Sequence, residues 1–158
     1  MLRLLYFFIL AIFLSSCGID VPELVESLRP PMGLKVVFTT NDTVRLEFWG
    51  FNDEDYFSGY VVFVSGNYNS IADVTTPISE KPKLLDFQTA TLPTFTSLPT
   101  SEPNSYVFEI NLSSVVVNDK GEKVFLRGFE YYVAVAAYSL SKRIYSPLSN
   151  ITNVILTN

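Results

Sequence analysis

Residues 129–138 read FEYYVAVAAY, and their side chains fall into two sets that alternate along the chain. A period of two places consecutive side chains on opposite faces of a β-strand. One face carries Tyr131, Val133, Val135 and Ala137, and the other carries Tyr132, Ala134, Ala136 and Tyr138. Both faces are apolar or aromatic, whereas a strand with one face in water normally alternates between apolar and polar residues. The stretch therefore predicts a strand whose second face is either covered or available to a partner.

Residues 57–65 (FSGYVVFVS) show the same double-sided pattern, with Tyr60, Val62 and Val64 on one face and Val61 and Phe63 on the other. Shorter period-two segments are found at 34–39, 43–48, 105–112 and 150–157. Turn-forming residues such as Asn41-Asp42 separate them. Several short strands with turns between them predict an all-β fold, specifically a two-sheet antiparallel sandwich.

One long segment, residues 67–103, interrupts the strand pattern. It contains five of the nine prolines of the chain and eleven serine or threonine residues. It also contains enough apolar residues to pack against the domain. We expect an insertion that is functional, flexible or irregularly structured rather than a simple linker.

The composition excludes several classes of protein. The chain of 158 residues is 48% hydrophobic and 17% charged, which is too apolar for a disordered acidic tail. It has one cysteine and no histidine, so an internal disulfide and histidine-based catalysis or metal binding are impossible. The net charge of −5 argues against a nucleic-acid partner.

The first sixteen residues have the pattern of a secretory signal. Arg3 precedes an uncharged apolar run over residues 4–14, which is too short to span a membrane as a helix. The following Leu14-Ser15-Ser16-Cys17 resembles the lipobox of bacterial lipoproteins. The resemblance implies cleavage before Cys17 and lipidation of its thiol. An ordinary secretory signal or a short membrane anchor, with Cys17 uninvolved, is the alternative interpretation.

Residues 17–31 are then expected to form a tether, or equally a disordered leader, in front of a domain at 32–158. Gly18 takes the place of the aspartate that retains some lipoproteins in the inner membrane. The resemblance therefore implies a lipid-anchored protein of the cell envelope, in the outer membrane rather than the inner.

Three stretches resemble strands of the fibronectin type III family. They are Phe57-Ser58-Gly59-Tyr60-Val61-Val62, Gly128-Phe129-Glu130-Tyr131, and Ser146-Pro147-Leu148-Ser149-Asn150. The resemblance covers about residues 31–157 and implies a sandwich of about seven strands, here with the insertion at 67–103. The phase of the second strand places Phe48 where the family has a core tryptophan, and Trp49 is then expected to point outward.

The sequence indicates no enzyme. Without histidine, a Ser-His or Cys-His relay cannot form, and Asp53, Glu54 and Asp55 lack the spacing of a calcium-binding loop. We predict no catalytic residue, no metal and no cofactor.

The candidate binding residues are the outward-facing apolar side chains, namely Val61, Phe63, Tyr132, Tyr138 and Trp49. In one interpretation the outer face formed by residues 57–65 and 129–138 binds a partner. In the other, which we favour, the insertion folds over it with residues such as Leu84, Leu85, Phe87 and Phe95, because the insertion has an apolar load of its own.

The resulting hypothesis is a membrane-anchored, non-enzymatic interaction module that binds a protein or a glycan. The alternative is a structural subunit of an envelope assembly that pairs through an exposed edge strand.

Overall fold

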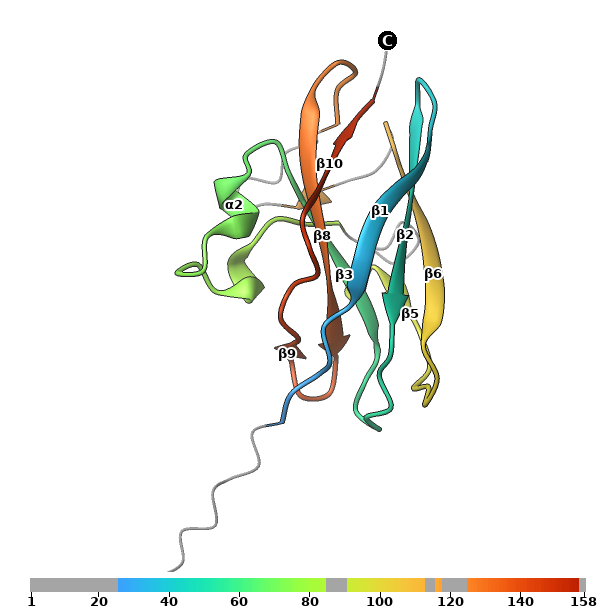
Figure 1. The fold of residues 1–158 in the computed structure, drawn as a ribbon. Coiled ribbons are helices and arrows are strands. Elements are labelled where there is room, and N and C mark those ends of the chain that lie inside the picture. Colours follow the sequence, from blue (N-terminus) through green and yellow to red (C-terminus); the bar gives the residue numbers. More distant parts are fainter. Residues whose placement is uncertain (1–25, 85–90, 113–115, 118–124, 157–158) are drawn as a thin grey trace, which may run out of the picture.

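The computed structural model describes residues 26–84, 91–112, 116–117 and 125–156. These residues form ten strands in two antiparallel sheets that face each other (Figure 1). The predicted all-β, two-sheet sandwich is confirmed. The predicted signal, Cys17 and the first part of the tether lie outside the described residues, as do Leu85 and Phe87.

The smaller sheet has three strands in the order β1-β2-β6. The strands are β1 (Met32–Thr39), β2 (Thr43–Gly50) and β6 (Asn104–Asn111). Val44, Leu46 and Phe48 of β2 are fully buried, and Trp49 is 45% exposed on the opposite face. Phe48 therefore points into the core and Trp49 points outward, as the alternation predicts.

The larger sheet has seven strands, with the path β10-β8-β3-β4-β7, β5 paired to β3 and β9 paired to β8. The strands are β3 (Gly59–Ser65), β4 (Lys83–Leu84), β5 (Phe95–Thr96), β7 (Val116–Val117), β8 (Glu130–Ser139), β9 (Ile144–Tyr145) and β10 (Thr152–Ile155). The two double-sided stretches become the paired strands β3 and β8, whose register runs from Gly59↔Tyr138 to Ser65↔Tyr132. The insertion contributes β4 and β5 to this sheet. It also forms the helix α2 (Asn69–Ala72) and the 3-10 helix η1 (Ile78–Glu80), which lie outside the sheet.

The core between the sheets is rich in aromatic rings. Phe48 contacts Tyr60 edge to face at 4.9 Å and stacks on Tyr106 at 5.4 Å, measured between ring centroids. The buried Tyr60 hydroxyl donates to Asn52 Oδ1 at 3.1 Å, and the backbone carbonyl of Asn52 accepts from the Thr100 N–H at 2.7 Å. Tyr60 thus buries a large ring without leaving its hydroxyl unpaired.

A second buried tyrosine, Tyr131, lies at the start of β8 and bonds to the chain just before it. Tyr131 is buried in the core, and its hydroxyl accepts a hydrogen bond of 2.7 Å from the Leu126 N–H. Its ring packs on Phe125 at 4.9 Å between centroids. This bond ties the chain that leads into β8 to the strand itself.

The end of the predicted tether packs against the domain. Leu28 is only 2% exposed and belongs to the core between the sheets. The packed chain thus begins before residue 32, the predicted domain start, because an apolar side chain of the leader fills part of the core. No helix in the described part of the chain is long and apolar enough to cross a membrane.

Candidate functional site

The outer face of β3 and β8 is covered. Val61, Phe63, Ala134 and Ala136 are fully buried and Tyr138 is nearly so. They form a second apolar cluster together with Ile71, Ile78, Leu92, Tyr145, Leu148 and Ile151. Two segments supply most of this cover, the α2–η1 segment and the connection from β9 to β10, while Leu92 of the insertion and Tyr145 of β9 complete it.

This arrangement changes the sequence interpretation in two respects. Val61 and Phe63 lie beneath the cover and offer no surface to a ligand. The insertion does cover the face, but with Ile71 and Ile78; Leu84 and Phe95, which we expected there, pack in the core between the sheets instead. They do so because β4 and β5 pair with β3, which directs their apolar side chains inward.

Lys81 fixes the α2–η1 segment. Its side chain is almost wholly buried, and its ammonium donates to the Ile71 carbonyl at 2.8 Å and to the Asp73 carbonyl at 2.6 Å. The Asp73 carboxylate accepts from the Thr75 N–H and hydroxyl, both at 2.8 Å, and from the Thr76 hydroxyl at 2.9 Å. These donors lower the pKa of Asp73, so the carboxylate stays charged and the turn stays closed.

Two serines fix the connection from β9 to β10. The Ser146 hydroxyl accepts from the Ala137 N–H at 2.9 Å, and the Ser149 hydroxyl accepts from the Val135 N–H at 3.0 Å. Their own N–H groups donate to the carbonyls of the same two β8 residues, at 3.0 and 2.8 Å. The serines therefore satisfy the backbone N–H and carbonyl groups of Val135 and Ala137, which no regular strand pairs with on that side of β8. Between the two serines, Leu148 packs on the apolar cluster over β3 and β8, and Pro147 is exposed.

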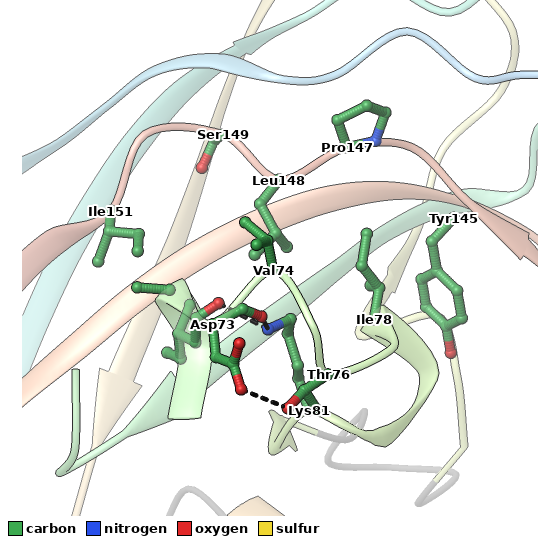
Figure 2. A pocket seen from close by; sticks show the side chains of 12 residues that line it. Asp73, Val74, Thr76, Ile78, Lys81, Tyr145, Pro147, Leu148, Ser149 and Ile151 are labelled. Carbon is green, nitrogen blue, oxygen red and sulfur yellow. Dashed lines mark hydrogen bonds between the residues drawn. The ribbon is translucent and has the colours of Figure 1, made fainter. Parts of the chain in front are cut away.

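A pocket of about 530 Å³ lies between these two segments (Figure 2). Its lining comprises Ile71, Ala72, Asp73, Val74, Thr76, Ile78, Lys81, Tyr145, Pro147, Leu148, Ser149 and Ile151. Most of these side chains are apolar. Val74 belongs to this lining and is 96% exposed.

Tyr145 connects the pocket to the covered face below it. Its ring lies 4.6 Å from the Tyr138 ring and 6.0 Å from the Phe63 ring, measured between centroids. Burial, followed by the neighbouring Tyr138, raises the pKa of Tyr145 to about 12. Tyr145 is therefore neutral at physiological pH and adds an uncharged aromatic wall.

The five predicted binding residues do not form one surface. Phe63 and Tyr138 pack directly against the pocket residue Tyr145, and Val61 lies in the same buried cluster. Tyr132 is half-buried against Tyr68, at 5.3 Å between ring centroids, and its hydroxyl donates to Glu130 at 2.9 Å. Trp49 lies on the outer face of the other sheet.

Sequence reasoning missed the pocket itself. Its two walls come from residues 71–81 and 145–151, which have no strand or helix periodicity. The only sequence signal was the Ser146–Ser149 stretch, where a proline and a leucine stand between two serines that can bond to backbone.

The charged groups of the pocket are occupied by structural bonds. Lys81 and Asp73 are held by the backbone and hydroxyl partners given above. Within the described ranges, no three His, Cys, Asp or Glu side chains gather where they could hold a metal ion. The arrangement can enclose an apolar group, and the Thr76 and Ser149 hydroxyls of its lining are also held by structural hydrogen bonds.

The chain matches no known protein-family model, and a search of curated proteins found no similar sequence.

Proposed function

We propose that this protein is a lipid-anchored lipoprotein of the cell envelope, and that its fibronectin type III-like sandwich is a non-enzymatic interaction module. The lipobox-like Leu14-Ser15-Ser16-Cys17 supports the anchor. The hydroxyl of Tyr131 bonded to the Leu126 N–H supports the fibronectin-like assignment, because such a tyrosine corner is a hallmark of immunoglobulin-like sandwiches.

The observation that carries the interaction role is the pocket between the α2–η1 segment and residues 146–149. Its apolar lining suits the aliphatic and aromatic side chains of a protein partner, and its volume can hold more than one of them. A glycan fits less well, because the lining is mostly apolar and the charged groups of Lys81 and Asp73 are held by structural hydrogen bonds.

The anchor is tested by labelling cells with a radioactive fatty acid and by measuring the mass of the N-terminal peptide of the mature protein. We expect label and an acyl mass on Cys17, and neither in Cys17→Ala. An unmodified Cys17 in the mature protein would contradict the anchor and leave the pocket hypothesis to be tested on its own.

The interaction role is tested with a photo-crosslinking residue in place of Val74, using the delipidated protein and an envelope extract. We expect a discrete crosslinked protein that disappears when Leu148→Arg fills the pocket. The matched control places the same residue at Val107, which is exposed on the outer face of the other sheet. The same product at both positions, or a product that survives Leu148→Arg, would contradict the proposal.

One observation favours the structural-subunit alternative. β1 and β6 are the two end strands of the three-stranded sheet, and a second chain could pair with such an edge. Sedimentation at increasing concentration separates the two functions, since an assembly subunit would form larger species and a simple binding module would stay at one mass.

A further inference from the structure

The predicted tether, residues 17–31, is called the leader from here on. Its residues 26–29 contact the sandwich at one end. Glu26 pairs with Lys142 at 2.8 Å, and the Ser27 carbonyl accepts from the Tyr56 hydroxyl at 3.2 Å. Arg29 pairs with Asp53 at 3.2 Å. Together with the buried Leu28, these contacts hold the leader against the β2–β3 loop and the β8–β9 turn. Figure 1 shows both at the same end of the sandwich as the residues before β1, opposite the end where β10 finishes.

Two exposed leucines lie at this same end. Leu98 is 84% exposed and Leu140 is 58% exposed. Both flank Ser58 of the β2–β3 loop, because the Ser97 N–H donates to the Ser58 carbonyl at 3.3 Å and the Leu140 N–H donates to the Ser58 hydroxyl at 2.9 Å. The leader, the loop and both leucines therefore belong to one surface, which we call the leader end.

The length of the leader limits how far this surface can lie from the membrane. Nine Cα–Cα steps separate Cys17 from Glu26 (26 minus 17). A fully extended chain covers at most about 3.6 Å per step, so Glu26 cannot lie more than about 32 Å from the lipidated residue. β8 runs from the opposite end of the sandwich to the leader end, and its ten residues span about 33 Å, so the leader end is the part of the domain that the shortest length of chain joins to Cys17.

We infer that the leader end faces the bilayer and that Leu98 and Leu140 rest in its interfacial layer. This inference rests on the proposed lipidation of Cys17. Exposed leucines gain free energy when they enter the boundary between headgroups and acyl chains, and the docked leader holds them on the side from which the anchor comes. The opposite end then points away from the bilayer.

The charges of the leader end indicate which lipid it prefers. Its carboxylates are Glu26, Asp53, Glu54 and Asp55, and its cations are Arg29, Lys142 and Arg143. Arg29 and Lys142 are paired with Asp53 and Glu26, so the carboxylates are in excess by one. A surface with excess carboxylates is repelled by anionic headgroups. The contact should therefore be closer on zwitterionic vesicles than on vesicles rich in anionic lipid, and this difference should shrink in high salt.

The test uses the full lipidated protein in vesicles of zwitterionic lipid that contain a shallow lipid quencher. Leu140→Cys and Phe129→Cys form a matched pair, since the residues flank the two ends of β8 and are 58% and 59% exposed. Leu98→Cys is the second leader-end site. The natural cysteine carries the lipid, so each introduced thiol is the only one that reacts with a fluorescent label.

We expect quenching at positions 98 and 140 to exceed quenching at position 129 by about twofold or more, because interfacial side chains sit within roughly 5–10 Å of the acyl boundary. Equal quenching at 140 and 129, or stronger quenching at 129, in protein that floats with the vesicles would overturn the orientation and leave the anchor intact. Protein without acyl mass that fails to float would overturn the anchor and the orientation together.

Discussion

Gly50 is the last residue of β2, and its Cα lies against the hydroxyl end of the buried Tyr60 ring. A Cβ at this position would collide with Tyr60 Oη and lie 2.6 Å from Tyr60 Cζ. The Tyr60 ring is fully buried between Phe48 and Tyr106 and has no space to move aside. The absence of a side chain at residue 50 thus permits the tyrosine at residue 60.

Gly50→Ala should therefore lower the free energy of unfolding by about 1–3 kcal/mol, the usual cost of overpacking a core. Chemical denaturation monitored by Trp49 fluorescence measures this loss. Gly66→Ala is the control, because a Cβ there would have its nearest neighbour at a comfortable 3.9 Å. Equal stability of the two variants would show that Tyr60 can shift, against the prediction.

At the scale of elements, the strands with a clear period of two were predictable and the short irregular pieces were not. The alternation predicted correctly which side chains of β2, β3 and β8 point inward, because one face of each strand fills the core between the sheets. β4 and β5 are two-residue strands, and so short a segment has no period to detect. The sequence indicated that the insertion covers the outer face, but not that the α2–η1 segment does so, because the packing of this segment depends on Lys81 reaching two carbonyls, which is a tertiary contact.

The candidate site was predictable only in part for the same reason. The apolar outer face of β3 and β8 was visible in the sequence, and the structure places Phe63 and Tyr138 against a pocket wall. The pocket itself depends on how two non-periodic segments stand apart above that face. Neither segment has a local pattern that fixes their separation.

The connection from β9 to β10 offers a test at this scale. Replacing both Ser146 and Ser149 with alanine removes the acceptors of two buried β8 N–H groups. An unsatisfied buried donor costs about 1–3 kcal/mol, so the double variant should lose stability and its Ala137 and Val135 amides should exchange faster with solvent. Hydrogen exchange resolved by residue measures both amides.

Ser79→Ala is the matched control for this change, since Ser79 is exposed on η1. It should leave exchange at Ala137 and Val135 unchanged. Slow exchange of both amides in the Ser146→Ala, Ser149→Ala variant would mean that other groups satisfy them and that the serines do not hold the pocket wall.

For the whole molecule, the absence of histidine and the buried tyrosines determine how stability depends on pH. The carboxyl groups with displaced pKa values, such as Asp73 and Glu47, are shifted downward by their hydrogen bonds, so they stay charged well below neutral pH. Tyr145 is shifted upward to about 12, and burial raises the pKa of Tyr60 still further. With no histidine in the chain, no side chain with an ordinary pKa near neutrality changes charge on folding.

The free energy of unfolding should therefore be nearly constant from about pH 6 to about pH 9. A tyrosine whose pKa is higher in the folded state than in the unfolded state stabilises the fold fully below its unfolded value, near 10, and loses that contribution as the pH rises toward its folded value. Stability should thus fall above about pH 10. Denaturation midpoints measured across this range test the prediction, and Tyr145→Phe should reduce the alkaline loss because phenylalanine has no proton to release. A steep change in stability between pH 6 and pH 8 would contradict the proposed protonation states, because it would require a group that titrates near neutrality.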